Sequence, residues 1–125
     1  MKREALIEYI RQQYAVEPEF PWSTSPNFAV FRHTGNQKWF GLVIDISGDK
    51  LGLADNRIIE VLNVKAPVEM VGQLRQIKGI FPAYHMNKEH WISVLLDGGL
   101  DDKTILEILD DSYSLTAPRR PKSTV

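Results

Sequence analysis

Two β-type segments separated by only four residues constrain the fold of this chain more than any other feature. Phe28–His33 and Lys38–Asp45 are rich in aromatic and branched side chains, and the Thr34–Gln37 segment between them contains Gly35 and Asn36. Gly and Asn tolerate the positive φ of a tight hairpin, so we expect these two residues to adopt it. Strands joined by so short a turn must be antiparallel neighbours, which excludes a purely parallel sheet.

The rest of the chain supplies further strands and three helices. Hydrophobic periodicity predicts helices over Lys2–Tyr14, from Pro67 to Ile77 with Gly79 as the capping residue, and from Asp101 to Tyr113. It also predicts a short edge strand over Leu51–Leu53 and strands over Arg57–Val64 and Tyr84–Leu96, the last clearest from Trp91.

This order of elements predicts an α+β fold: a two-layer α/β sandwich in which helices cover a mainly antiparallel sheet. The expected order is α-β-β-(β)-β-α-β-α, the strand in brackets being Leu51–Leu53. In the strand after the hairpin, Phe40, Leu42 and Ile44 alternate with Trp39, Gly41 and Val43. We expect the core to hold Phe40, Leu42, Ile44, Val61, Trp91, Val94, Leu106 and Leu109.

Length and composition limit the organisation of the chain. Its 125 residues suit one domain, which we place at residues 1–117, followed by a flexible basic tail at residues 118–125. No apolar run approaches the roughly 20 residues that span a bilayer, and residues 1–20 lack the apolar core of a signal peptide. We therefore expect a cytoplasmic monomer without a membrane partner. With no Cys, the chain has no disulfide and no Cys-ligated zinc.

The charges are unevenly distributed along the chain, although the formal net charge is only −1. Residues 61–96 carry a net +2 and residues 97–111 a net −5. This balance excludes a surface that is basic all over, of the kind typical of strong nucleic-acid binders. It leaves room for one basic face or one acidic face.

The usual catalytic motifs are absent from the sequence. There is no P-loop, no GxGxxG, no HExxH and no GxSxG, and no pattern places an activating His beside a nucleophile. The acidic pairs Asp101/Asp102 and Asp110/Asp111 are typical of a helix N-terminus and of a solvated helix face. We predict no catalytic residues, no cofactor and no metal site.

The segment PAYHMNKEHW, residues 82–91, is the richest in chemistry. In a strand, its side chains would alternate, with Tyr84, Met86, Lys88 and His90 on one side and His85, Asn87, Glu89 and Trp91 on the other. His85 and His90 would then face opposite ways, which argues against a shared metal. The polar cluster has two interpretations: a recognition pocket lined by Tyr84, His85, Asn87, Lys88, His90 and Trp91, or a hydrogen-bonded network that holds the preceding loop.

This segment also carries a family resemblance. PAYHMNKEHW, the LLDGG and DSYSLT that follow, and the upstream FAVFRHTGNQKWFGLV and LNVKAPVEMVGQLRQIKGIFPAYHMN resemble the MmcQ/YjbR family of small bacterial proteins, over residues 3–117. The resemblance implies the two-layer sandwich shared with the bacterial frataxin CyaY, and DNA binding through loops of the sheet that act as paired wings. It implies no catalytic residues. Frataxins have a strongly acidic first helix, whereas acidic and basic residues balance here, which argues against iron handling.

Of the three functional classes, an enzyme is the least favoured, because no pattern places a nucleophile beside a base, and two hypotheses precede it. The first is a DNA-binding module of weak, largely non-specific affinity, with candidate contacts at Arg32, His33, Lys38, Lys50, Arg57 and Lys88. The second is a module without catalytic activity that binds another protein or a small ligand through the Tyr84–Trp91 segment.

Overall fold

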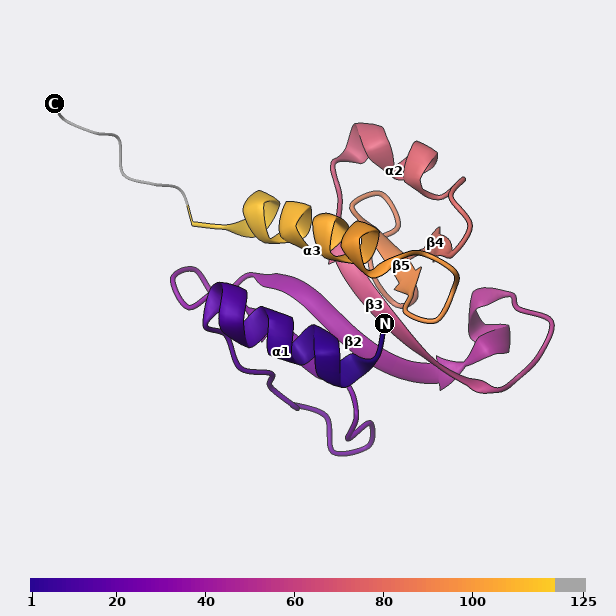
Figure 1. Ribbon diagram of the computed structural model, residues 1–125, viewed down its shortest axis with the longest axis horizontal. Helices are drawn as coiled ribbons and strands as arrows, with labels where there is room; N and C mark the ends of the chain where they lie inside the picture. Colours follow the sequence, from indigo (N-terminus) through magenta and orange to yellow (C-terminus); the bar gives the residue numbers. More distant parts are fainter. Residues whose placement is uncertain (119–125) are drawn as a thin grey trace, which may run out of the picture.

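The computed structural model describes residues 1–118, which contain three helices and five strands. The elements are α1 (Arg3–Tyr14), β1 (Ala29–Arg32), β2 (Trp39–Ser47), the 3₁₀ helix η1 (Gly48–Leu51), β3 (Ile58–Lys65), α2 (Val68–Leu74), β4 (Ile80–Pro82), β5 (Trp91–Leu95) and α3 (Asp102–Thr116) (Figure 1). Apart from Pro118, the predicted basic tail lies outside the described residues. No helix within residues 1–118 is long and apolar enough to cross a bilayer.

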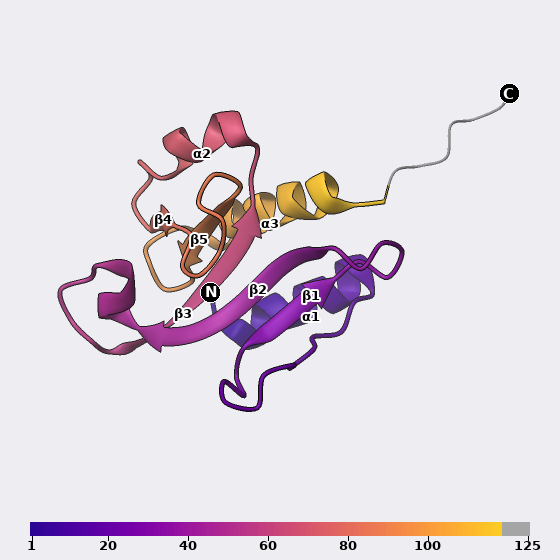
Figure 2. The ribbon, with the colours of Figure 1, turned by 180° about the vertical axis from the view of Figure 1, so that it is seen from behind.

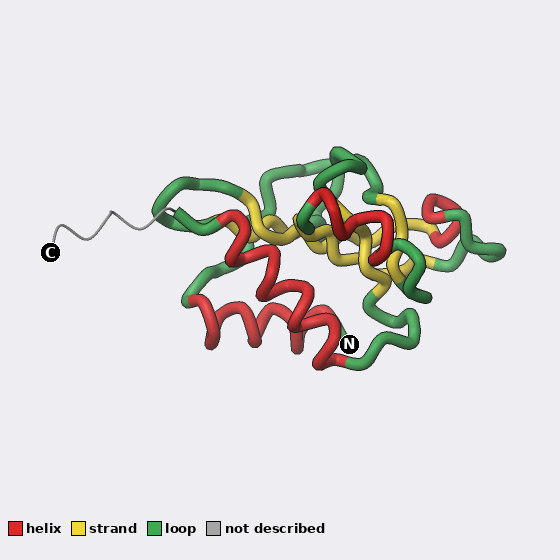
Figure 3. The backbone as a smooth tube through the Cα atoms, turned by 90° about the horizontal axis from the view of Figure 1, so that it is seen from above, coloured by secondary structure: helices red, strands yellow, loops and turns green. Residues whose placement is uncertain are grey.

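The five strands form one antiparallel sheet in the order β1-β2-β3-β5-β4. Helices α1 and α3 lie together on one side of this sheet, and Figure 3 shows the two layers edge-on. The shorter α2 packs near β5 through Val71, its one buried residue. The two-layer α+β sandwich is therefore confirmed, with β4 as a strand that the sequence did not predict.

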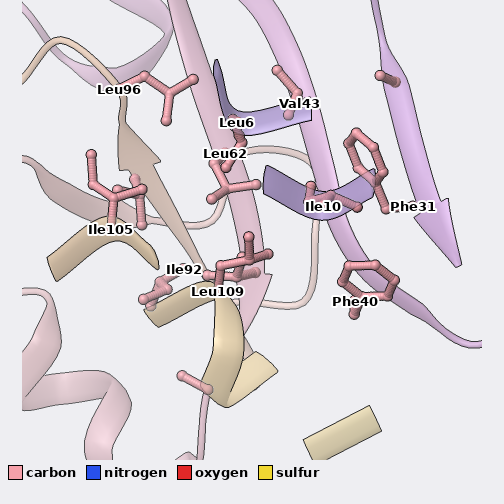
Figure 4. Packing of buried hydrophobic residues seen from close by; sticks show 14 of the residues in the cluster. Leu6, Ile10, Phe31, Phe40, Val43, Leu62, Ile92, Leu96, Ile105 and Leu109 are labelled. Carbon is pink, nitrogen blue, oxygen red and sulfur yellow. The ribbon is translucent and has the colours of Figure 1, made fainter. Parts of the chain in front are cut away.

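The main core lies between the sheet and helices α1 and α3. It contains Leu6 and Ile10 of α1, Ile105 and Leu109 of α3, and apolar residues from every strand, of which Figure 4 shows the centre. Six of the eight predicted core residues are buried: Phe40, Leu42, Ile44, Val61, Val94 and Leu109. Leu106 and Trp91 are only half-buried, which corrects the prediction.

A second apolar cluster covers the opposite face of the sheet. Val30, Leu42, Ile44, Ile46, Ile59, Val61 and Leu95 are buried there beneath side chains from loops and strand ends, among them Trp22, Phe28, Trp39, Leu53, Tyr84 and Met86. No α-helix of residues 1–118 packs on this face, which is turned toward the viewer in Figure 2; Leu51 of η1 packs there. We call it the loop-covered face.

A β-bulge in β2 decides which of its side chains meet the helices. The pairing with β1 steps from Phe31↔Gly41 to Arg32↔Trp39, so Phe40 is an extra residue. The bulge turns Phe40 toward the helices, in the same cluster as Val43, while Leu42 and Ile44 line the loop-covered face. The simple alternation predicted for Phe40 was therefore wrong.

The first hairpin forms where it was predicted, but a different residue adopts the positive φ. The positive φ belongs to Gln37, at 62°, and neither Gly35 nor Asn36 adopts one. Asn36 acts through its side chain, which donates to the Thr116 carbonyl oxygen at 2.9 Å and accepts from the Lys38 amide at 3.0 Å. These bonds connect the hairpin to the end of α3.

Two further local predictions need correction. The expected strand at Leu51–Leu53 is replaced by η1 and the turn after it, because Gly52 adopts a φ of 82° and ends the helix. Helix α2 stops at Leu74 instead of continuing to Ile77, and Pro67 precedes its first turn. Gly79, with a φ of 96°, serves the turn into β4, where its carbonyl accepts from the Leu95 amide at 2.9 Å.

Candidate functional site

Residues 84–90 form a turn that lies on the loop-covered face, and we call this segment the Tyr84 loop. The predicted strand Tyr84–Leu96 is real only from Trp91, so the alternation of side chains expected over residues 84–90 was wrong. Pro82 ends β4, and His85 has a φ of 57°, a left-handed conformation that interrupts an extended chain.

Two buried strand residues hold the Tyr84 loop in place. The Tyr84 amide donates to the Ser93 hydroxyl at 2.9 Å, and the Tyr84 carbonyl accepts from the Asn63 side-chain amide at 3.0 Å. The Ser93 hydroxyl in turn donates to the Asn63 side-chain oxygen at 2.5 Å. Both side chains are fully buried, so each needs these partners.

The polar side chains of the Tyr84 loop itself point outward. His85, Asn87 and Lys88 are exposed, and the His85 ring lies 4.1 Å from the Tyr84 ring, centroid to centroid. Asn87 accepts from the Glu89 amide at 2.8 Å, a bond within the loop. One interpretation expected these polar side chains to form a network that holds the preceding loop. The network in the structure is a different one, in which Asn63 and Ser93 hold the backbone of Tyr84.

Two hollows flank the Tyr84 loop. The first, of about 300 Å³, is the Trp hollow, lined by Gln37, Lys38, Trp39, Lys65, Met86, Trp91 and Thr116. The second, of about 200 Å³, is the Tyr84 hollow, lined by Lys50, Leu51, Phe81, Pro82, Ala83, Tyr84 and Lys88. The single predicted pocket is thereby divided: Trp91 lines the first hollow, Tyr84 and Lys88 line the second, and His85, Asn87 and His90 line neither.

Lysine is the only charged residue type in both linings. Lys38 and Lys65 line the Trp hollow, Lys50 and Lys88 line the Tyr84 hollow, and neither lining includes a carboxylate. Within residues 1–118, none of these four lysines forms an ion pair. The side-chain ion pairs of that range use arginines instead: Arg3 with Glu60, Arg11 with Glu8 and Glu17, Arg32 with Glu19, and Arg57 with Asp55.

The six predicted nucleic-acid contacts therefore fall into different environments. Lys38, Lys50 and Lys88 are exposed beside the Tyr84 loop. Arg32 donates twice to the Glu19 carboxylate, at 2.8 and 2.5 Å, and this hydrogen bonding lowers the pKa of Glu19. Arg57 lies 3.7 Å from Asp55 and lines a separate cavity of about 700 Å³ beside the start of α1.

His33 is a core residue, which corrects its assignment as a surface contact. It is 3% exposed, and its Nε2 lies 2.8 Å from the Thr116 hydroxyl. Its ring packs 4.3 Å from Tyr113 and 5.1 Å from Phe40, centroid to centroid. This burial lowers the pKa of His33, so the neutral imidazole is favoured.

The acidic segment 97–111 belongs to the helix layer, away from the two hollows. Asp101 caps α3 by accepting from the Thr104 amide at 2.8 Å, and this bond lowers the pKa of Asp101. Asp110 accepts hydrogen bonds from the hydroxyls of Tyr9 and Tyr14. Because no residue of the acidic segment 97–111 lines either hollow, a chain of net charge −1 still presents lysines in two linings that contain no carboxylate.

Two tryptophans and a lysine align across three neighbouring strands at one end of the sheet. Trp39 begins β2, Lys65 ends β3, and Trp91, the register partner of Lys65, begins β5. The Trp22 ring packs edge-on against Trp39 at 5.8 Å between centroids. Sequence reasoning missed Lys65 and Trp39 as site residues. The position of Lys65 directly after the apolar run VLNV nevertheless marks a charged side chain at the end of a predicted strand.

Comparisons with known proteins agree with this architecture. A family model described as YjbR matches residues 11–115. The Bacillus subtilis protein YyaQ is 39% identical over 116 residues, covering 93% of this chain and 98% of YyaQ. The YjbR protein of Escherichia coli K12 is 40% identical over 53 residues, which is 42% of this chain and 45% of that protein.

Solved structures show the same fold. A crystal structure of a Pseudomonas syringae protein, 45% identical, superimposes with a TM-score of 0.92 over 94% of this chain and 100% of that one. A Deinococcus radiodurans protein, 25% identical, gives a TM-score of 0.64 over 87% of this chain and 76% of that one. The names of these relatives state no activity or ligand, and the implied likeness to CyaY stays a prediction.

Proposed function

The chain belongs to the YjbR family, and from that premise we propose that its loop-covered face binds nucleic acid weakly and with little sequence preference. One observation carries the proposal: Lys38, Lys65, Lys50 and Lys88 line two hollows that contain no carboxylate, and none of the four forms an ion pair within residues 1–118. Unpaired ammonium groups in hollows whose linings contain no carboxylate attract phosphates.

The same charges account for weak affinity. Four lysines neutralise at most four phosphates, which suits a dissociation constant of roughly 10⁻⁴ to 10⁻⁶ M at physiological salt. A lysine is a point charge without the planar fork by which arginine reads guanine. The two arginines predicted as contacts, Arg32 and Arg57, lie beside carboxylates, which favours backbone contacts over base reading.

Matched charge changes test this proposal. The double variant Lys50→Gln/Lys88→Gln removes two charges beside the Tyr84 loop, and Lys78→Gln/Lys103→Gln removes two exposed charges outside both hollows. Fluorescence anisotropy with a labelled oligonucleotide in 50 mM salt should show a several-fold weaker dissociation constant for the first variant only. Equal effects of the two variants, or no binding by the wild-type protein, would reject the proposal.

A small ligand bound without catalysis is the second candidate, and the Trp hollow favours it. Trp39, Met86 and Trp91 supply apolar walls, and the volume of about 300 Å³ is at the lower end of known ligand pockets. This candidate predicts that a free mononucleotide binds as tightly as an oligonucleotide, whereas the nucleic-acid proposal predicts much tighter binding of the oligonucleotide. Calorimetric titration of both ligands distinguishes the two.

A further inference from the structure

On the basis of the proposed function, we propose that the Trp hollow accepts an unstacked base of a single-stranded nucleic acid, which gives this face a preference for single strands over duplexes. The occupant is one flat base with its adjoining phosphates. The argument rests on the positions of Trp39, Lys65 and Trp91 and on the charge of the lining.

The geometry provides two aromatic walls with a cation between them. Trp39 and Trp91 start the strands on either side of β3, and Lys65 ends β3 between them. Two strand spacings separate the backbones of the two tryptophans, which is roughly 10 Å. Both indoles line the same hollow, together with Met86 from the Tyr84 loop.

The hollow is held by packing on both sides. Trp22 packs edge-on against Trp39, with 5.8 Å between ring centroids, and this contact limits its rotation. Met86 belongs to the loop that Asn63 and Ser93 fix through the Tyr84 backbone. A preformed aromatic site loses little conformational entropy when a ligand binds.

The chemistry of the lining suits a base attached to a charged backbone. Tryptophan stacks on the π-face of any base, and lysine neutralises a neighbouring phosphate. Lys38 and Lys65 provide that charge within the lining itself. In a duplex, the π-faces are covered by neighbouring base pairs, so a duplex can use the lysines but not the indoles.

Three probes of equal length test this proposal on the wild-type protein. We expect a 12-mer of deoxythymidine to bind about tenfold more tightly than its duplex with deoxyadenosine, and about tenfold more tightly than an abasic 12-mer with the same phosphates. Equal affinities for the three probes would overturn the proposal and leave the proposed function intact. If no probe binds, the proposed function fails as well.

Two variants test whether the preference for single strands arises in the Trp hollow. Trp91→Ala should lower the affinity for the deoxythymidine 12-mer about tenfold and leave the affinity for the abasic 12-mer unchanged. Phe20→Ala removes a 53% exposed aromatic residue outside the hollow and should change neither affinity. Because Trp91→Ala also removes packing, Trp91→Phe is the second variant, and it should retain most of the preference.

The remaining outcomes contradict the proposal. If Trp91→Ala keeps the full preference for the deoxythymidine 12-mer while its circular dichroism spectrum is unchanged, the base does not bind in the Trp hollow. If free thymidine monophosphate binds as tightly as the 12-mer, the occupant is a small ligand and not a strand.

Discussion

Asn63 and Ser93 are register partners on β3 and β5, and their two buried side chains hold both backbone groups of Tyr84. The Tyr84 loop is thus fixed at its first residue, whereas its outer side chains are exposed. One short polar network therefore positions a surface that lies between two lysine-lined hollows.

Removal of this network should destabilise the protein. Asn63→Ala removes the acceptor of the Ser93 hydroxyl proton and the donor to the Tyr84 carbonyl, and we expect a loss of about 2 kcal/mol in the free energy of unfolding. Urea denaturation measures this loss. A variant as stable as the wild type would show that the network does not hold the loop.

The exposed polar residues of the loop should behave in the opposite way. His85→Ala/Asn87→Ala removes two exposed side chains that form no hydrogen bond with Asn63 or Ser93, so the free energy of unfolding should change by no more than about 0.5 kcal/mol. Thermal and urea denaturation provide the check. A loss of about 2 kcal/mol would show that the side chains of His85 and Asn87 stabilise the fold.

Trp91 should contribute less to stability than a core aromatic residue. Phe40 is fully buried between the sheet and the helices, and Phe40→Ala should cost about 3–5 kcal/mol. Trp91 is half-buried at the end of the sheet, so Trp91→Ala should cost less than about 2 kcal/mol. Equal losses, measured side by side in urea, would place Trp91 in the core after all.

His33 should make the stability depend on pH. Burial holds the pKa of His33 below its ordinary value of 6.5, so below about pH 6.5 the unfolded chain binds more protons than the folded chain. The contribution of His33 is complete above that pH and decreases as the pH falls toward the lowered pKa. The free energy of unfolding of the wild type should therefore fall between pH 7 and pH 5.5.

Two variants attribute this pH dependence to one residue. His33→Gln should lose most of the fall between pH 7 and pH 5.5, because it removes the titrating imidazole from the core. His85→Gln, at an exposed histidine, should keep the fall. If both variants behave like the wild type, the dependence arises from other groups.

The sequence predicted the layers and most of the core because these follow from local periodicity. The helices at residues 3–14 and 102–116 repeat their apolar residues at the helical spacing, and the strands β2 and β3 are short runs rich in apolar residues. The strand β4 was missed because three residues carry too little pattern, and Phe40 was misplaced because a bulge depends on the partner strand.

The candidate site was less accessible to prediction. Lys38, Lys65 and Trp91 are far apart in the sequence, and only the sheet order brings them to one hollow. His33 was taken for a surface cation because its position beside a hairpin does not reveal that α3 covers it. A useful signal was nevertheless present: Asn63 and Ser93 are polar residues inside apolar runs, which indicates a buried hydrogen-bonded pair.

The salt dependence of oligonucleotide binding tests the central claim most directly. With four lysines on the phosphates of a single strand, the logarithm of the association constant should fall against the logarithm of the salt concentration with a slope of about −3. The quadruple variant Lys38→Gln/Lys50→Gln/Lys65→Gln/Lys88→Gln should bring that slope close to zero. A wild-type slope near zero, or a slope that the quadruple variant leaves unchanged, would contradict the assignment of this face to nucleic acid.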